Sequence, residues 1–278
     1  MITESLQKKI EQSIRLLQQV QKAHPDEVIE IAYSGGKDSD VILQLAKEAG
    51  ISYEAIYKNT TIDPPGTISH AQEIGATIIR PKRTFAELIQ KKGSPTRFAR
   101  FCCSELKEYK VRDVSVMGVR KSESAKRAER YSEPTQCRFY GSKKNHVEAI
   151  YPILEWTNED VADYITDRKI KCAPIYYDEE GVFHVERRLG CMCCPLASKK
   201  NRIDEFRKYP RMVRFYLRNM MIFREKHPDI KAWNYFSSEY EQFAYQVFYQ
   251  ELPLKKFKQQ MFDTDWKKLL EEYFKIKL

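Results

Sequence analysis

The sequence predicts an α/β protein with a doubly wound parallel sheet and a helical C-terminal extension. Short runs rich in β-branched and aromatic residues alternate with segments of helical periodicity, as a parallel sheet with crossover helices requires. The first of these runs enters a helix through a turn that holds two glycines. Residues 201–278 have helical periodicity and contain no glycine. We therefore expect a sheet-containing domain followed by helices.

Three regions follow one another along the chain. Residues 1–27 predict an N-terminal amphipathic helix, because aliphatic side chains recur on one face. Residues 28–200 predict a nucleotide-binding domain that also carries a cysteine cluster, and residues 201–278 a helical region. Within the second region we expect strands at 27–32, 51–60, 76–82 and 111–120, and helices at 41–50, 67–75 and 84–93.

Composition limits the class of protein. The 278 residues are 42% hydrophobic and 31% charged, which is typical of a globular chain. No apolar run reaches membrane-spanning length and the first residues lack a signal-peptide pattern, so we expect a cytoplasmic protein with no membrane partner. The net charge of +9 is compatible with a nucleic-acid partner, and equally with solvated surface lysines.

The turn Tyr-Ser-Gly-Gly-Lys-Asp-Ser predicts an anion site. It joins a buried strand to a helix N-terminus, where backbone N–H groups and the helix dipole favour a phosphate. Glycines allow a ligand to approach the backbone closely, while the serine hydroxyls and the lysine add donors and charge. The alternative is an ordinary strand-to-helix turn with a polar helix cap. The candidate phosphate-binding residues are Ser34, Gly35, Gly36, Lys37, Asp38 and Ser39.

A second polar turn follows the next expected strand. Ligands of such sheets bind beyond the carboxyl ends of the strands. We therefore expect Thr60, Thr61 and Asp63 to lie near the same nucleotide. The alternative is a turn that two prolines make stiff.

Seven cysteines indicate metal or sulfur chemistry rather than disulfides, because the number is odd and the chain looks cytoplasmic. Cys102 and Cys103 are adjacent, and Cys191 and Cys194 have ligand spacing. Four thiolates can hold zinc or a [4Fe–4S] cluster. Adjacent cysteines are poor zinc ligands, which favours iron–sulfur. Buried cysteines that act only as small hydrophobic residues are the remaining alternative.

The motifs together resemble a known superfamily. The string S-G-G-K-D-S is similar to the pyrophosphate loop of the ATP pyrophosphatases, and the Cys-Cys and Cys-x-x-Cys pairs resemble the cluster ligands of assimilatory adenylylsulfate reductases. The strings "MGVRKSESAKRAER", "YPILEWTNEDVADYI" and "GCMCCP" agree with that pattern. The chain is identified, from residue 28 to 197, as a member of the phosphoadenylylsulfate reductase superfamily.

Within that superfamily the resemblance implies one reaction before another. Reductases carry a nucleophilic cysteine in a C-terminal E-C-G-L-H motif, whereas no cysteine follows Cys194 here. The chain looks more like the ATP pyrophosphatases of DNA phosphorothioation and the iron–sulfur tRNA thiolases, which activate an oxygen with ATP and replace it by sulfur. Sulfonucleotide reduction to sulfite, and an iron–sulfur nucleotide-binding scaffold, are the alternatives.

The resemblance also implies cofactors and partners. We expect ATP, Mg²⁺ and a [4Fe–4S] cluster held by the four cysteines named above. The expected partners are an adenine nucleotide, a cysteine desulfurase or other sulfur donor, and a nucleic acid acceptor. We also expect a homo-oligomer.

Five residues are candidates for catalysis. Lys37 would oppose the charge of departing pyrophosphate and Asp38 would help to hold Mg²⁺. Arg120 and Arg127 would clamp the phosphates, although a solvated basic loop is the alternative. Cys137, beside a basic residue in a segment expected to be irregular, would carry a persulfide or else be an ordinary loop cysteine.

The remaining features have less specific explanations. Cys172 is expected in packing, and Cys193 as a spare thiol beside the cluster. In residues 201–278 aromatics alternate with lysines and arginines. That composition serves single-stranded nucleic acid, and it also serves a helical cap whose aromatics pack on the sheet, which we favour.

Overall fold

The structure is a computed structural model that describes residues 2–140, 142–231, 235–260 and 264–278. It divides into two compact units. Unit 1 comprises Met1–Asn59, Asp63–Arg80 and Lys107–Gly190, and unit 2 comprises Thr60–Ile62, Pro81–Leu106 and Cys191–Leu278. The chain therefore passes between the units more than once, whereas each of the regions expected from the sequence, 1–27, 28–200 and 201–278, is continuous.

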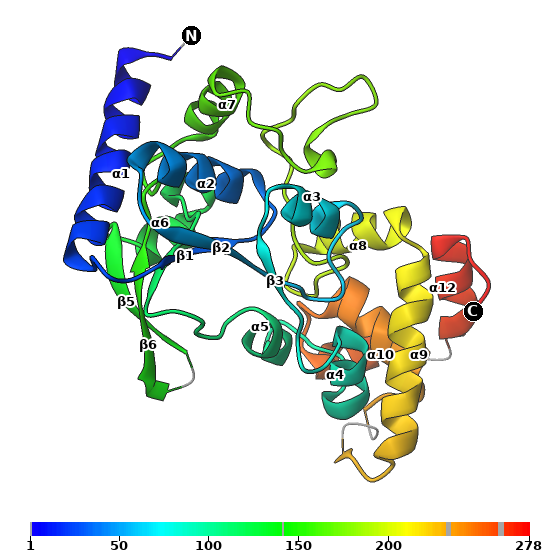
Figure 1. The fold of residues 1–278 in the computed structure, drawn as a ribbon. Coiled ribbons are helices and arrows are strands. Elements are labelled where there is room, and N and C mark those ends of the chain that lie inside the picture. The colour runs from blue at the N-terminus through cyan, green and yellow to red at the C-terminus, as the bar shows by residue number, and fades with distance from the viewer. Residues whose placement is uncertain (1, 141, 232–234, 261–263) are drawn as a thin grey trace. The chain divides into compact units, whose positions relative to one another are not determined.

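Unit 1 contains a six-stranded sheet in the order β3-β2-β1-β4-β6-β5 (Figure 1). Strands β3, β2, β1, β4 and β6 are mutually parallel, and β5 pairs antiparallel with β6 at one edge. The order reverses beside β1, which is the switch point of a doubly wound sheet and the position where such sheets bind ligands. The predicted fold class is therefore confirmed. The strands are β1 Ile29–Tyr33, β2 Tyr53–Lys58, β3 Thr77–Ile79, β4 Val114–Val116, β5 Thr135–Tyr140 and β6 Ser142–Ile150.

Helices of unit 1 bury their apolar faces in one core with the sheet. The long helix at the N-terminus, blue in Figure 1, packs on the helix that follows β1, as its aliphatic periodicity predicted. Side-chain caps define where two of the helices begin, because Thr3 accepts from the Leu6 N–H and Thr157 forms a capping box with Asp160. The helices are α1 Glu4–Ala23, α2 Lys37–Ala49, α3 Thr67–Glu73, α6 Ala125–Arg130 and α7 Asn158–Asp167, with short 3₁₀ turns at Lys121–Glu123 and Pro174–Tyr176.

The hairpin formed by β5 and β6 was not expected. The segment before residue 140 looked irregular, yet it forms β5 and pairs with β6 from Thr135↔Ile150 onward. Its alternation of exposed and half-buried residues is the period of a strand with one solvated face. The expectation was wrong because both faces of this strand carry polar or charged side chains. The alternation of apolar and polar residues that predicts a strand is therefore absent from the sequence.

Unit 2 is helical, and its core is aromatic. Phe206, Tyr216, Phe243 and Phe257 are all buried there. The region is helical, as expected, but these aromatic residues pack in a core of unit 2 itself, whereas the helical-cap interpretation had them packing on the sheet. The helices are α4 Phe85–Lys92, α5 Phe101–Leu106, α8 Lys199–Lys208, α9 Arg211–Lys226, α10 Glu239–Ala244, a π-helical turn at Tyr245–Tyr249, α11 Leu254–Gln260 and α12 Trp266–Phe274.

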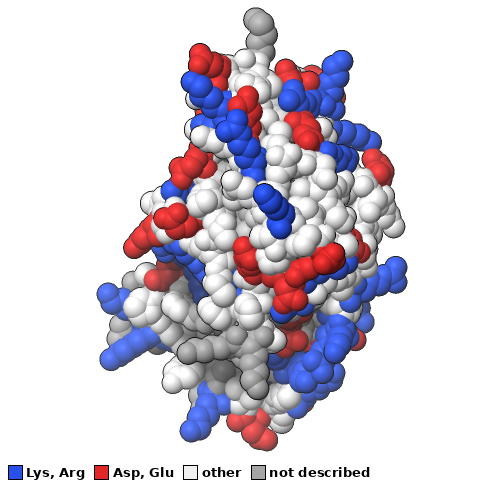
Figure 2. Space-filling model, turned by 60° about the vertical axis from the view of Figure 1, so that its left-hand side comes forward, with Lys and Arg blue, Asp and Glu red and all other residues white. Residues whose placement is uncertain are grey.

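The surface gives no single indication of a partner. None of the described helices is both long enough and apolar enough to cross a membrane. On the face shown in Figure 2, the described Lys and Arg side chains are interspersed with Asp and Glu rather than gathered in one field. The charge pattern of that face therefore does not identify a binding site, and the candidate sites are identified from the arrangement of their side chains.

Candidate nucleotide and cysteine sites

The glycine-containing turn closes on itself at the carboxyl end of β1. The Ser39 hydroxyl donates to the Gly36 carbonyl at 2.6 Å, and the Gly36 N–H lies 3.3 Å from the Ser34 hydroxyl oxygen that accepts from it. Gly36 is the N-cap residue of α2 and has no side-chain cap. The N-cap side chain therefore does not satisfy the first N–H groups of α2, and the Tyr176 hydroxyl hydrogen-bonds to the Lys37 backbone at this end of the helix.

Gly35 is required by both its conformation and its surroundings. Its φ of +76° lies in the left-handed region, which costs any residue with a Cβ. A Cβ there would also lie 2.7 Å from Cγ2 of Thr67, the first residue of α3. The turn and α3 are thus in direct contact.

A buried hydrogen-bonded group lies behind the turn. The Tyr33 hydroxyl donates to Asp40 Oδ1 at 2.5 Å, and His70 Nε2 lies 3.0 Å from the same oxygen. All three side chains are buried, and burial raises the pKa of the Asp40 carboxyl, with His70 and Tyr33 opposing that shift. This group ties β1, α2 and α3 together on both sides of the turn.

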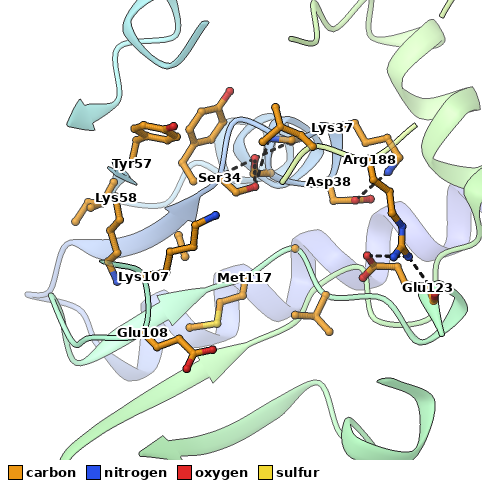
Figure 3. Close-up of a pocket in the computed structure, with 18 of the residues that line it drawn as sticks. Ser34, Lys37, Asp38, Tyr57, Lys58, Lys107, Glu108, Met117, Glu123 and Arg188 are labelled. Carbon is orange, nitrogen blue, oxygen red and sulfur yellow. Dashed lines mark hydrogen bonds and ion pairs between the residues drawn. The ribbon is translucent and has the colours of Figure 1, made fainter. Parts of the chain in front are cut away.

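The turn borders a cavity of about 430 Å³ that lies wholly in unit 1 (Figure 3). The cavity brings together Ser34, Gly36, Lys37, Asp38 and Ser39 from the predicted loop. Its lining contains six cationic side chains and three carboxylates. The cations are Lys37, Lys58, Lys107, Arg127, Arg138 and Arg188, and the carboxylates are Asp38, Glu108 and Glu123. A lining with this excess of positive charge favours a polyanionic ligand.

Lys37 and Asp38 form a nearly buried pair at the start of α2. Lys37 is 4% exposed, and its Nζ lies 3.2 Å from Asp38 Oδ2 and 5.5 Å from the centre of the Tyr176 ring. Arg120 donates from Nε to Asp38 Oδ1 at 2.7 Å. The Asp38 carboxylate therefore already has two cationic partners, so these contacts give no support to its expected role as a Mg²⁺ ligand.

Arg120 and Arg127 occupy different environments. Arg120 is 1% exposed, and its other donors reach Ser122 and Asn158. It is not among the residues that line the cavity, and it reaches the cavity only through its contact with Asp38, which does line it. Arg127 does line the cavity, where it forms an ion pair with Glu123.

Five further predicted residues lie outside the cavity lining, namely Gly35, Thr60, Thr61, Asp63 and Cys137. Asp63 accepts from the hydroxyl of Tyr57, a lining residue, at 2.7 Å. Thr60 is buried in unit 2, where the Cys191 thiol lies 3.6 Å from its hydroxyl. Cys137 is exposed on β5, on the face opposite the neighbouring Arg138 that lines the cavity.

Sequence reasoning missed several lining residues. Lys58 is the last residue of β2 and lines the cavity. The expectation that ligands bind beyond the ends of strands led us to select residues after Lys58 and not Lys58 itself. Burial lowers the pKa of Lys58. Arg138 and Tyr140 belong to the unexpected hairpin. Met117 and Glu123 lie in the quoted string "MGVRKSESAKRAER" but were not selected as site residues. No motif could have identified the others, which are Tyr57, Lys107, Glu108, Tyr176, Arg188 and Leu189.

Unit 2 contains all four predicted cluster cysteines. Cys102 and Cys103 lie on α5, and Cys191 and Cys194 lie in the turn before α8. Cys193, between the latter two, is buried and has a φ of 52°. The sequence assigned these cysteines to the nucleotide-binding domain, whereas in the structure they belong to the helical unit 2.

Helices of unit 2 fix the second cysteine turn in place. The buried Tyr216 hydroxyl donates to the Cys193 carbonyl at 3.1 Å, and Gln250 Nε2 donates to the Pro195 carbonyl at 2.9 Å. The Met192 N–H donates to the Ile62 carbonyl at 2.8 Å. The backbone of this turn is therefore held from three sides by residues that lie far apart in sequence.

The four thiols fit a four-thiolate group by their chemistry. A hydrogen bond to Cys103 and burial raise the pKa of the Cys102 thiol far above its ordinary value, and the Cys194 and Cys191 thiols add to the shift. Burial, with contributions from Cys191 and Cys103, raises the pKa of Cys194 to about 11. The thiols are thus near enough to influence one another, and a cation would relieve that repulsion. In the described part of the chain, no three His, Cys, Asp or Glu side chains already have metal-ligand geometry.

Fold and site together define a nucleotide-utilising α/β protein with a pyrophosphate-type loop. Comparison with known families narrows this class. Residues 29–197 match the phosphoadenosine phosphosulfate reductase domain, and the chain belongs to that family. The match covers the loop, the cavity and both cysteine pairs.

Individual relatives share part of their length with this chain. An uncharacterized protein of Methanocaldococcus jannaschii is 28% identical over 198 residues, which is 66% of this chain and 45% of that protein. An uncharacterized 37.8 kDa protein of Escherichia phage 186 is 31% identical over 188 residues, 62% of this chain and 49% of that protein. The chain thus spans about half the length of the curated relatives it matches.

Similar solved structures belong to several enzymes. The phosphoadenylyl-sulfate reductase of Candida auris aligns with a TM-score of 0.46 at 16% identity, over 69% of this chain and 96% of that one. The U34-tRNA thiolase of Methanococcus maripaludis with its [4Fe–4S] cluster aligns with a TM-score of 0.41 at 16% identity, over 80% of each chain.

Proposed function

We propose that this protein is an ATP pyrophosphatase that activates an acceptor oxygen by adenylylation and replaces it with sulfur. The observation that carries the proposal is the cavity lining, in which six cations line a cavity that is bordered by the glycine-containing turn and the N-terminus of α2. ATP, bound as its Mg²⁺ complex, is the polyanion that this arrangement and the family membership favour together.

The residues of the loop would act on the departing pyrophosphate. Attack of the acceptor oxygen on the α-phosphorus breaks the bond to the bridging oxygen, and pyrophosphate leaves. Lys37 and the N–H groups at the start of α2 oppose the charge that develops on it. Asp38, held by Arg120, keeps Lys37 in place. Hydrosulfide then displaces AMP from the activated acceptor, which leaves sulfur where oxygen was.

The cysteine site would serve the sulfur side of the reaction. Cys102, Cys103, Cys191 and Cys194 are the residues that would hold a [4Fe–4S] cluster. Such a cluster, when bound, would bind and position the incoming sulfide. The chain's own contribution is to fix the second cysteine pair through Tyr216 and Gln250. A cysteine desulfurase would supply the sulfur as a persulfide, and attack of a second thiol on that persulfide would release the hydrosulfide and leave a disulfide.

The acceptor is proposed to be a nucleic acid, as in DNA phosphorothioation or tRNA thiolation. The support is the chain's basic balance and the cationic lining beyond the loop. Cys137 is exposed on the outer face of β5. Its proposed role as a persulfide carrier therefore requires that the substrate reach that face.

The test uses the full chain purified without oxygen. Iron and acid-labile sulfide are counted, and MgATP is then added and the products identified. Formation of AMP and pyrophosphate supports the proposal, and release of ADP and phosphate contradicts it. A Lys37→Met variant is expected to lose the activity, and Lys47→Met, which alters an exposed lysine of α2, serves as the control.

Sulfonucleotide reduction is the second candidate, and family membership favours it. Adenylylsulfate and phosphoadenylylsulfate also carry adenine and phosphate and would use the same loop. The same preparation is therefore given each sulfonucleotide with thioredoxin. Sulfite release would establish a reductase and remove the lead proposal. Failure to bind any adenine nucleotide would leave an iron–sulfur scaffold.

A further inference from the structure

The candidate nucleotide cavity has cations at two separate sides. Figure 3 shows Lys58 and Lys107 on one side, Arg188 and Glu123 on the opposite side, and Lys37 between them. Lys37 belongs to the loop, and Arg127 and Arg188 both pair with Glu123. These three cations are the ones that the proposed ATP polyphosphate would use. The cations on the side of Lys58 and Lys107 are not required to bind that polyphosphate.

Lys58, Lys107 and Arg138 come from three different segments of unit 1. Lys58 ends β2, Lys107 follows α5, and Arg138 is on the edge strand β5. Arg138 lies 3.9 Å from Glu108, which Figure 3 shows beside Lys107. Arg138 also contributes to the lowered pKa of Lys58, so the two cations are close together. Glu108 is the only carboxylate among the described lining residues on this side.

The contacts of these cations hold them in place. Lys58 Nζ donates to the Tyr109 carbonyl at 2.7 Å and lies 3.4 Å from Glu30 Oε1. Arg138 Nη1 contacts Met117 Sδ at 3.4 Å, and its guanidinium lies 5.2 Å from the centre of the Tyr140 ring. A second anion here would lower the repulsion between fixed cations at little cost in side-chain entropy.

An aromatic ring lies next to these cations. Tyr140 lines the cavity, and Phe139, 56% exposed, lies on the outer face of the same strand. Cations that hold a phosphate beside rings on which bases stack are the combination that binds single-stranded nucleic acid. Because β5 is the edge strand of the sheet, an extended ligand can reach it from solvent.

We propose that Lys58, Lys107 and Arg138, with Tyr140, form a second phosphate subsite that takes one nucleotide unit of a single-stranded nucleic acid. The inference rests on the proposed function and names its acceptor. In that arrangement the acceptor strand follows β5 and enters the cavity from the side opposite the polyphosphate, so that an oxygen of the flipped nucleotide faces the α-phosphate.

The test is binding of a fluorescein-labelled oligothymidylate and its oligouridylate counterpart to the full chain, followed by anisotropy at several salt concentrations. Arg138→Gln and Lys107→Gln are expected to weaken binding roughly tenfold each. Each should also lower the slope of log affinity against log salt by about 0.7, the value for one lost phosphate contact on a single strand. Both residues are only partly buried, which favours folding of the variants. Lys47→Gln, an exposed lysine outside the cavity, should change neither quantity.

Three outcomes decide the inference. Wild-type affinity and slope in both cavity variants would overturn it. A second result would also overturn it: neither oligonucleotide binds, but the two cavity variants lose affinity for adenosine 3′,5′-bisphosphate. The subsite would then hold the phosphate of a mononucleotide. Gly35→Ala separates the two proposals: loss of ATP binding with retained oligonucleotide binding supports a distinct subsite, whatever the reaction proves to be.

Discussion

The Arg120 guanidinium donates to Asp38 at 2.7 Å and thereby joins the segment after β4 to the first turn of α2. Gly118 makes this approach possible, since a Cβ on it would lie 3.1 Å from the Asp38 backbone. Arg120 belongs to the basic segment that was expected to cover the phosphates. In the structure it supports the glycine-containing turn through its contact with Asp38. Arg120 is a positioning residue in this arrangement.

Removal of Arg120 should destabilise the fold. Arg120→Ala leaves the mostly buried Asp38 without its closer cationic partner, and we expect a loss of about 3 kcal/mol in the free energy of unfolding. Arg120→Lys keeps the charge but cannot reach Asp38, Ser122 and Asn158 together, so an intermediate loss is expected. Urea unfolding measures both.

Arg15→Ala is the matched control for Arg120. Arg15 is an exposed arginine of α1 that lies 3.7 Å from Glu11, and such surface pairs contribute about 0–1 kcal/mol. If Arg120→Ala unfolds at the same urea concentration as Arg15→Ala, the buried pair does not hold α2.

Gly35→Ala should abolish ATP binding. The alanine would have to adopt a positive φ, at a cost of about 1–2 kcal/mol, and would collide with Thr67. Gly50→Ala is the control, because Gly50 has a φ of +66° but nothing within 4 Å of its added Cβ. We expect both variants to lose stability and only Gly35→Ala to lose ATP affinity, as measured by calorimetry.

A second substitution identifies the cause of that effect. Thr67→Ala removes the Cγ2 that the new methyl would meet, so the double variant should regain part of the ATP affinity. If the double variant binds ATP no better than Gly35→Ala, the close contact with α3 is not what the glycine protects.

The cysteine site can be tested one thiol at a time. Serine at Cys102, Cys103, Cys191 or Cys194 should each lower the iron and acid-labile sulfide of anaerobically purified protein, because each thiolate is one of four ligands. Cys137→Ser alters an exposed thiol in unit 1 and should leave both contents unchanged. Equal iron in all five variants would contradict the assignment, and zinc in place of iron would correct the metal.

The sequence predicted the local parts of this molecule better than the distant ones. The turn at Gly35 and Gly36 could be predicted because strand, glycines and helix are contiguous in the chain. Arg138 and Lys107 could not be assigned to the same cavity, since only the pairing of β5 with β6 and the passage of the chain between units bring them there. Tyr216 and Gln250 hold the cysteine turn from helices with no motif, so only tertiary structure shows their role.

The buried Asp40 should make stability fall as pH rises. Burial raises the pKa of its carboxyl above the ordinary value of 3.8, so between that pH and the raised value the folded state binds more protons than the unfolded state. The stability that Asp40 contributes is therefore complete at low pH and lost as pH rises through the raised pKa. Tyr33, His70 and Cys172 face this carboxyl, so the difference between the wild type and Asp40→Asn isolates its titration.

Urea unfolding of both proteins from pH 4 to pH 8 makes the comparison. The wild type should lose stability relative to Asp40→Asn as pH increases. Asp113→Asn is the control, because a hydrogen bond from Lys110 lowers the pKa of Asp113 and its small contribution is lost only as pH falls below the ordinary value of 3.8, so this variant should not change the pH dependence in the measured range. A difference between wild type and Asp40→Asn that stays constant or grows with pH would contradict this prediction, because Asp40 would then be ionised in the folded state throughout the range.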